Sequence, residues 1–512
     1  MVESVYWNVG PSQTAPYGAA SSPKGRAKVA SLHANETAKL QFVCLPGNAD
    51  MHNIETAWKG DDAMARTLDM TKGKPLGLLT AFAVPLLFGN ICQVLYSVAD
   101  STVVGRILGV EAFAAVGAAG FYSWLVLDIV LGLSQGLEVL LGQQFGKKDE
   151  LGLHRAVAMS VLLTGVLSIL LTVCAQAAVE PVLSAAGTPE DIRAQTALYL
   201  RWWLAGVPAM AAYNLCASLL RAMGNSRVPL ISVIVSSVSN VALNLLFAAV
   251  FHWGVAGVAV ATVCAQILSF LACLWALRKI PEVRLWKEDF RLHGPTMREL
   301  LRLSLPPALR NGIICLGGFF VQKEINRYGT LFVAGLSASE RYLSLMTLIG
   351  GALEGAIATF TAQNYGAGKM DRVRSGMAAA RNMGLISSAA TALMVIAVRR
   401  PLIALLVSGT PEELAVIVDC GSRGLTLMAL FLPALYLLCI HRAAIQGMGN
   451  ALFPTLSGFT ELAARLAVVT VLPIWIGRWG IYLATPLAWV CAFVLLAVAY
   501  HRVCRSREKA IT

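Results

Sequence analysis

Long hydrophobic runs, separated by short polar segments, make up the chain from Leu76 onward. Each run is long enough for an α-helix to cross a bilayer, which takes about 20 residues. The pattern predicts an all-α polytopic membrane protein with twelve transmembrane helices, at residues 76–103, 111–143, 155–178, 195–220, 228–250, 254–278, 303–326, 331–361, 377–400, 413–445, 454–476 and 480–502.

The first 63 residues differ from the rest of the chain. They are polar, contain Gly, Pro, Ser and Asn throughout, and hold no apolar run of spanning length. They also lack the basic start, apolar stretch and small-residue cleavage site of a signal peptide. We therefore predict a disordered extension over residues 1–63, or sequence upstream of the true start with Met64 as the initiator.

Composition supports a membrane protein and argues against most soluble classes. Of the 512 residues, 57% are hydrophobic and 14% are charged, whereas about 25% are charged in an average soluble domain. The 11 Cys residues are scattered singly, without a Cys-x-x-Cys pair. This spacing predicts small core residues and neither a disulfide framework nor a metal site.

Basic residues decide the expected orientation in the membrane. With the N-terminus inside, Lys and Arg gather in the inner segments, which include Arg221, the loop at 279–302 and Arg442. Positively charged segments stay on the cytoplasmic side. We therefore expect a multi-pass protein of the inner (cytoplasmic) membrane with both termini in the cytoplasm. The net charge of +12 then reflects topology in the lipid bilayer and requires no nucleic-acid partner.

The two halves of the chain resemble each other. Gln143–Gly146 (QQFG) matches Gln363–Gly366 (QNYG), and Met223–Asn225 matches Met448–Asn450, both with the sequence MGN. Six helices per half is an even number, so both halves keep one orientation. Such two-lobed proteins hold a transported substrate between the lobes. A duplicated scaffold that transports nothing is the alternative.

This repeat sets the expected domain boundaries. An N-lobe with helices one to six should cover residues 64–278, and a C-lobe with helices seven to twelve should cover residues 303–505. A cytoplasmic inter-lobe loop at 279–302 joins the two lobes, and a cytoplasmic tail follows at 506–512.

Several motifs resemble those of multidrug and toxic-compound extrusion (MATE) transporters. They include Leu95–Gly105 (LYSVADSTVVG), Ala114–Gly117 (AAVG), the two Gln-x-x-Gly motifs and Gln446–Asn450 (QGMGN). The resemblance covers about residues 64–505. It implies a twelve-helix, two-lobe antiporter. Such a protein would export cationic or amphipathic small molecules and drugs against an inward flow of H+ or Na+.

A group of polar residues in the predicted N-lobe is the candidate for cation coupling. Asp100 ends an otherwise apolar helix, where a carboxylate needs a partner, a cavity or a proton. Asn240 and Asn244 are four residues apart on one helix face, and Thr262 lies on the next helix. Together these side chains could form an oxygen-lined cation site or a hydrogen-bond network. A helix cap at Asp100 and plain interhelical hydrogen bonding are the alternatives.

The resemblance adds to this assignment. It implies an N-lobe cation site with an acid on helix one, matched by Asp100, and with residues matched by Asn240 and Thr262. Asn244 stands where many relatives have Asp. That departure removes a negative charge, weakens the case for tight Na+ binding and puts more weight on Asp100.

Other residues are predicted to line a substrate cavity. Gln93, Tyr96 and Asn214 resemble in position the lining of the family's N-lobe cavity, although such residues can also be simple packing. Asp128 and Glu354 are further acids deep in predicted spans, with the role of Asp128 left open. Two more acids are read as structural: Glu138 should reach cytoplasmic water, and Glu461 should pair with Arg465, four residues on.

Two rival functions are also compatible with the sequence. Three arginines, Arg310, Arg423 and Arg465, keep a lipid-linked oligosaccharide flippase of the same superfamily in play, and a non-transporting membrane scaffold is the other alternative. An enzyme is not expected, because the seven His residues form no metal or triad spacing and no GxxxxGK[ST] loop occurs. We expect no cofactor and no metal.

Overall fold

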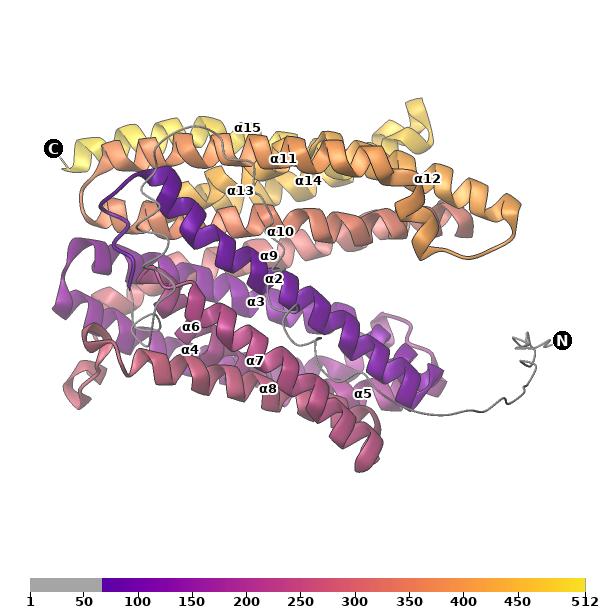
Figure 1. Cartoon of the computed structure of the whole chain (residues 1–512), viewed down its shortest axis with the longest axis horizontal. Helices are drawn as coiled ribbons and strands as arrows, with labels where there is room; N and C mark the ends of the chain where they lie inside the picture. Colours follow the sequence, from indigo (N-terminus) through magenta and orange to yellow (C-terminus); the bar gives the residue numbers. More distant parts are fainter. Residues whose placement is uncertain (1–66, 512) are drawn as a thin grey trace, which may run out of the picture. The chain divides into compact units, whose positions relative to one another are not determined.

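The computed structural model of the protein describes residues 67–511, so the predicted N-terminal extension at 1–63 lies outside the described residues. Over the described range the chain is mostly helical and contains no strand, which confirms the predicted all-α class (Figure 1). The helices in chain order are α2 (Pro75–Val103), η3 (Val104–Leu108), α3 (Val110–Lys147), α4 (Glu150–Ala185), α5 (Glu190–Ala205), α6 (Val207–Ala222), α7 (Arg227–Asn244), η4 (Leu245–Val250), α8 (Gly254–Leu277), η5 (Pro281–Val283), η6 (Lys287–Phe290), α9 (Gly294–Ile325), η7 (Asn326–Tyr328), α10 (Thr330–Gly366), α11 (Met370–Leu406), α12 (Pro411–Leu430), α13 (Leu432–Gly447), α14 (Leu452–Ile476) and α15 (Arg478–Ile511).

Twelve of these units correspond to the twelve predicted spans. Within residues 67–511, nine helices are long and apolar enough to cross a membrane unaided, and α5 with α6 and α12 with α13 form two bent pairs that also qualify. The twelfth is α9, which is long enough but carries charged residues such as Arg310 and Lys323 along its length. Its polarity shows that it is not a plain lipid-facing span.

In each bent pair, the break between the two helices lies just before a proline. The axis turns by 43° between α5 and α6 and by 45° between α12 and α13. Pro208 and Pro433 are each the second residue of the second helix in their pair. A proline has no N–H to donate and its ring collides with the preceding turn. The two bends occupy the same place in each half, as the sequence repeat requires.

Helix ends extend beyond several predicted boundaries. The helix α9 begins at Gly294, inside the segment predicted as an inter-lobe loop, and α15 runs to Ile511, through the predicted tail. Both α3 and α10 begin directly after a glycine, Gly109 or Gly329, each with a φ of 87°. Only glycine adopts this conformation without strain, so both glycines set where the second helix of each half starts.

The largest contacts between the two halves involve four helices. Contacts join α3 to both α9 and α10, and α2 to α10. Glycine makes the approach close: a Cβ added at Gly132 or Gly136 would collide with the backbone of α9. At the ends of α3 and α10 the arrangement is reciprocal, because a Cβ on Gly146 would strike the carbonyl of Gln363 and a Cβ on Gly366 would strike that of Gln143.

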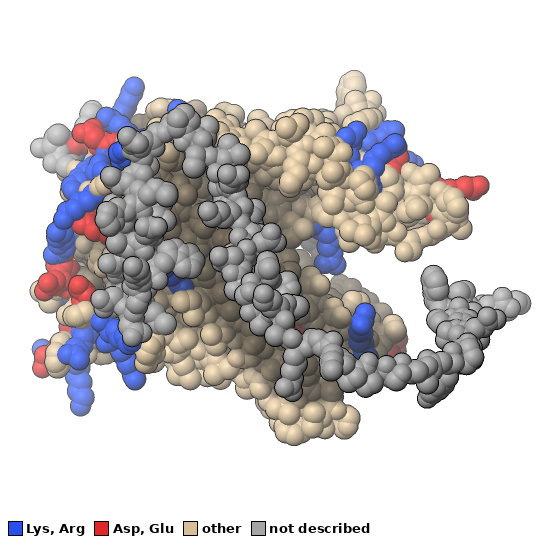
Figure 2. All heavy atoms as spheres, viewed as in Figure 1, with Lys and Arg blue, Asp and Glu red and all other residues tan. Residues whose placement is uncertain are grey.

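Charged side chains gather at the two ends of the helices. Figure 2 shows Lys, Arg, Asp and Glu at the end that carries the C-terminus and again at the opposite end, with an uncharged band between. Such a band is what the hydrocarbon core of a bilayer requires. The first end holds the starts of α2 and α11 and the last turns of α15 (Figure 1).

Candidate functional site

The four residues predicted for cation coupling lie together in the structure. Asp100 of α2 accepts a hydrogen bond from the Nδ2 of Asn244 on α7. The same Nδ2 donates to Oδ1 of Asn240 at 2.6 Å, and Nδ2 of Asn240 donates to Oγ1 of Thr262 on α8 at 3.3 Å. One continuous chain of hydrogen bonds therefore connects three helices. We call these four residues the polar cluster.

Local helix geometry changes beside the polar cluster. Asn244 is the last residue of α7, and the π-helical turn η4 follows it directly. A second π-helical turn, η3, begins four residues after Asp100. The two π turns contact each other. Such turns are rare overall and are frequent at functional sites.

The polar cluster contains an acceptor with no donor. Asn240 and Asn244 are fully buried, and Asp100 is half-buried. Asn244 uses both amide protons, while its Oδ1 is buried without a hydrogen-bond partner. An unmatched buried acceptor carries a free-energy cost. A proton on a neighbouring oxygen, or a small hard cation, would offset that cost, so the donor set fits either one.

Tyr96 connects the polar cluster to a cavity. Its hydroxyl lies 3.4 Å from Oγ1 of Thr262. That hydroxyl of Thr262 donates its one proton to the carbonyl of Val258 at 3.1 Å, so Tyr96 is the donor in the shared hydrogen bond. The side chain of Tyr96 also lines the cavity. A change in the polar cluster can therefore reach the cavity through one residue.

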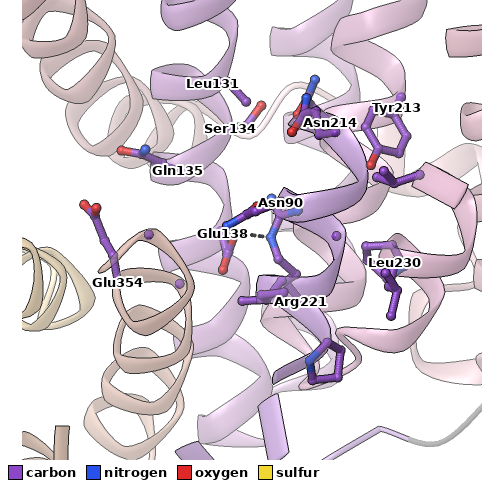
Figure 3. A pocket seen from close by; sticks show the side chains of 18 of the residues that line it. Asn90, Leu131, Ser134, Gln135, Glu138, Tyr213, Asn214, Arg221, Leu230 and Glu354 are labelled. Carbon is purple, nitrogen blue, oxygen red and sulfur yellow. Dashed lines mark hydrogen bonds and ion pairs between the residues drawn. The ribbon is translucent and has the colours of Figure 1, made fainter. Parts of the chain in front are cut away.

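This central cavity has a volume of about 430 Å³, within the range of small-molecule sites. Residues of α2, α3, α6, α7, α8, α10 and α13 line it, so both halves of the chain contribute. Figure 3 shows several of the lining side chains, including Gln135, Glu138, Asn214 and Glu354. Four residues predicted for the substrate cavity are in its wall: Gln93, Tyr96, Asn214 and Glu354.

Asp128, the fifth predicted cavity residue, is not among the residues that line this cavity. Asp128 lies nearer the start of α3 than the cavity-lining residues of that helix, and it is half-buried. Its backbone carbonyl accepts a hydrogen bond from Nδ2 of Asn311 at 3.1 Å. Its position thus joins α3 to α9 by a main-chain contact, and the structure does not bring it to the other four.

An ion pair in the cavity wall corrects the sequence interpretation of Glu138. Instead of reaching water, Glu138 is 7% exposed, and its Oε2 accepts from Nε of Arg221 at 2.8 Å (Figure 3). Its other oxygen accepts from the Thr359 hydroxyl of α10 at 3.0 Å. Hydropathy placed Glu138 and Arg221 at span ends, but α3 continues past Glu138 to Lys147 and packs against α6, which carries Arg221.

A second buried charge network lies in the C-terminal half. Glu461 pairs with Arg465 at 3.5 Å, which confirms that prediction. Glu461 also pairs with Arg442, which is buried in α13 rather than placed in an inner loop. Arg310 is 2% exposed and is held by amide oxygens of Gln135, Gln446 and Asn311. No carboxylate of the described residues forms an ion pair with Arg310.

Metal-binding groups do not cluster in the part of the chain that the structure describes. There, no three His, Cys, Asp or Glu side chains are close enough together to hold a metal ion. The polar cluster is different in kind, because it offers one carboxylate together with amide and hydroxyl oxygens.

The chain resembles known transporters in sequence and in structure. The profile of the MatE family matches residues 85–246 and 306–469, one stretch in each half. The probable multidrug resistance protein YpnP of Bacillus subtilis is 32% identical over 316 residues, which cover 60% of this chain and 69% of that protein. The probable multidrug resistance protein NorM of Thermotoga maritima is 23% identical over 406 residues, covering 77% and 85%.

Fold similarity extends over most of the described chain. A solved structure of a MOP superfamily transporter from Pyrococcus furiosus matches with a TM-score of 0.81 at 19% identity, over 86% of this chain and 99% of that one. A family profile that matches more than half of the sequence, in two repeats, is decisive. The chain belongs to the MATE family of membrane transporters.

Proposed function

We propose that this protein exports cationic or amphipathic small molecules across a bacterial inner membrane in exchange for H+ or Na+. The observation that carries the proposal is the connection between the polar cluster around Asp100 and the central cavity through Tyr96. Transport, rather than catalysis, is the activity that such a connection serves. We place both termini of the chain in the cytoplasm, as the distribution of Lys and Arg indicates.

The chemistry of the central cavity favours a cationic or amphipathic substrate. Tyr96 and Tyr213 supply aromatic faces, and Glu354 supplies a carboxylate without an ion pair among the described residues. Aromatic rings attract cations through their electron-rich faces. Leucine, valine and proline side chains in the same wall suit the apolar part of such a molecule.

Coupling follows from competition for the negative charge of Asp100. When Asp100 is ionised, it accepts from Asn244 as the structure has it. A proton or Na+ on Asp100 would alter that hydrogen bond, shift Asn244, Asn240 and Thr262, and act on Tyr96 in the cavity wall. We propose that this change releases the substrate outside, and that loss of the ion toward the cytoplasm resets the carrier.

Alternating access requires that one entrance to the cavity close while the other opens. The reciprocal contact of Gly146 and Gly366 closes the end that we assign to the cytoplasm. Two further hydrogen bonds cross between the halves there, from Gln143 Nε2 to the carbonyl of Gly447 and from Gln363 Nε2 to that of Ala222, both at 2.8 Å. This conformation would release substrate to the outside.

Efflux from proteoliposomes tests the proposal. The full-length protein would be reconstituted, loaded with a fluorescent cationic dye, and given a proton gradient or a sodium gradient separately. We expect one of the two gradients to drive dye movement, and Asp100→Asn to reduce it to the level of empty liposomes. Asp191→Asn, an exposed acid at the start of α5, is the matched control. Full gradient-driven efflux in Asp100→Asn would contradict the proposal.

Buried arginines favour a second candidate, a flippase for lipid-linked oligosaccharides. Arg310 is buried without a carboxylate partner in the described chain and reaches Gln135 and Gln446 of the cavity wall. An anionic pyrophosphate would suit such a site. In the Pyrococcus furiosus transporter, a binding pocket of reversed polarity suggests a different function for that protein. Movement of an anionic lipid-linked sugar, lost in Arg310→Gln, would favour this candidate over drug export.

A further inference from the structure

A second pocket lies away from the central cavity, on the outside of the C-terminal half. It has a volume of about 300 Å³ and opens between α11, α13 and α15. The polar side chains in its wall are Arg374, Arg381, His441, Tyr500, His501 and Arg505. No described acidic residue lines it. We call it the basic pocket.

The internal repeat allows the basic pocket to be compared with the equivalent groove in the N-terminal half. The helices α4, α6 and α8 correspond to α11, α13 and α15, because they are the third, fourth and sixth spans of each half. There, Val283 of the inter-lobe segment packs into one apolar cluster with Leu153 of α4 and Cys273 of α8. Asp289 of the same segment lies 3.9 Å from Nδ1 of His154. An apolar side chain and a carboxylate thus cover this groove.

The basic pocket lacks such a cover in the described residues. Arg374 is the fifth residue of α11, and His154 is the fifth residue of α4, so the two positions correspond. Where His154 meets a carboxylate from the loop, Arg374 pairs with Glu508 of α15, outside the pocket wall, and lies 3.8 Å from Asp371. Arg381 and Arg505 have no ion pair in the described chain and are exposed. Their positive charge is available to a ligand.

The position of the pocket identifies the environment of that ligand. Arg374 lies in the second turn of α11, at the end of the helices that we assign to the cytoplasm. Beyond Arg381, α11 exposes Ile386 at 72% and Leu393 at 74%, as a helix that faces lipid does. The pocket therefore stands where head groups of the inner leaflet meet the apolar band.

We propose that the basic pocket binds the phosphate of an anionic phospholipid from the cytoplasmic leaflet. Arg guanidinium groups bind phosphate oxygens through paired, charge-assisted hydrogen bonds. Basic pockets between spans on the cytoplasmic side bind such head groups in general. The acyl chains would lie along the exposed apolar face of α11, which supplies the apolar contact that Val283 makes in the other half.

Lipid retention by the purified full-length protein tests this assignment. The protein would be exchanged into detergent with phosphatidylglycerol or with phosphatidylcholine, and bound lipid would be counted by native mass spectrometry. We expect retained phosphatidylglycerol in the wild type. In the double variant Arg381→Gln, Arg505→Gln we expect an affinity about 30-fold lower, because the loss of each basic side chain near the membrane surface should lower the affinity about fivefold. Arg400→Gln, exposed near the opposite end of α11, is the matched control and should retain lipid normally.

Three outcomes would overturn the assignment. One is equal retention of phosphatidylcholine, and another is equal loss of phosphatidylglycerol in the Arg400→Gln control. The third is displacement of the lipid by millimolar inorganic phosphate with the same dependence on Arg381 and Arg505, which would make free phosphate the ligand. Melting temperatures of all variants, measured without added lipid, show that a loss of binding is not a loss of fold.

Discussion

Asn244 donates both of its amide protons, one to Asp100 and one to Asn240, and keeps a buried oxygen without a partner. This geometry matches an ionised Asp100, because an amide N–H needs an acceptor. If Asp100 takes up a proton, its new O–H needs an acceptor instead, and Oδ1 of Asn244 can serve after the amide turns over. The orientation of the Asn244 amide therefore depends on whether Asp100 is ionised or protonated.

Changing Asn244 to Asp should alter the ion preference of the polar cluster. Two carboxylates in contact repel unless a cation or a proton lies between them. We expect Asn244→Asp to make thermal stability and dye transport more dependent on Na+, measured as melting temperature and efflux rate against Na+ concentration at constant ionic strength. Asn244→Leu, which removes the donor without adding charge, should not gain Na+ dependence; a gain there would show that charge is not the cause.

The Glu138–Arg221 ion pair leads to a second prediction at the residue scale. Glu138→Gln leaves the Arg221 guanidinium in the cavity wall without its ion-pair partner. Breaking a buried pair in this way costs about 3–5 kcal/mol of stability in soluble proteins, so a clearly lower melting temperature in detergent is expected. Glu180→Gln, in an exposed pair with Arg193 and Arg201, should change it little, since exposed pairs contribute about 0–1 kcal/mol. Equal shifts in both variants would contradict the burial argument.

Much of the polar cluster can be predicted from sequence, whereas the ion pairs cannot. Asn240 and Asn244 stand out because each is polar inside an apolar run, and Asp100 stands out because it lies in the Leu95–Gly105 motif that resembles the family's. Glu138 and Arg442 do not, because each lies near the end of such a run, where hydropathy cannot separate a buried charge from a solvated one. Their partners, Arg221 and Glu461, come from other helices. Only packing brings these side chains together.

At the scale of helices, hydropathy finds all twelve spans but misplaces several ends. Polar residues near the ends of a helix can pack against other helices rather than lipid, and they make the hydrophobic run in the sequence shorter than the helix itself. For this reason α9 begins at Gly294 instead of 303 and α10 continues to Gly366 instead of ending at 361. The bends at Gly206 and Phe431 also escape hydropathy, although Pro208 and Pro433 indicate them.

Close packing of α3 on α10 depends on glycine and can be tested there. Gly146→Ala would place a methyl group against the carbonyl of Gln363, and overpacking of this kind costs about 1–3 kcal/mol. We expect a lower midpoint of thermal inactivation. Gly165→Ala in α4, where an added Cβ meets nothing within 4 Å, should leave the midpoint unchanged or raise it. An unchanged midpoint in Gly146→Ala would mean that the two helices do not approach so closely.

Across the whole molecule, the two halves make close contacts at the end assigned to the cytoplasm. Gly142 of α3 faces Ala362 of α10 there, with an ideal Cβ on Gly142 lying 3.0 Å from the Cβ of Ala362. The two motifs that repeat in sequence, QQFG and QNYG, therefore meet in space. We interpret them as the two sides of a gate that must separate once in each transport cycle.

Cross-linking this gate should stop transport. In a background without reactive native cysteines, the pair Gly142→Cys, Ala362→Cys should form a disulfide on oxidation, since the Cβ atoms are near bonding distance. Dye efflux from proteoliposomes should then cease and return with reductant, while each single variant is insensitive to oxidant. Undiminished efflux with the cross-link confirmed by peptide mapping would show that this end stays closed during transport.

The proposed exchange of substrate for an ion at Asp100, taken with H+ as that ion, is most directly tested by counting protons when substrate binds. Because linkage is reciprocal, a substrate that binds best when Asp100 is ionised must release protons as it binds. A cationic dye would be added to the purified protein in weakly buffered detergent solution near neutral pH, and the released protons titrated. We expect proton release from the wild type and from Asp191→Asn, and none from Asp100→Asn. Dye binding with equal proton release in wild type and Asp100→Asn would contradict it.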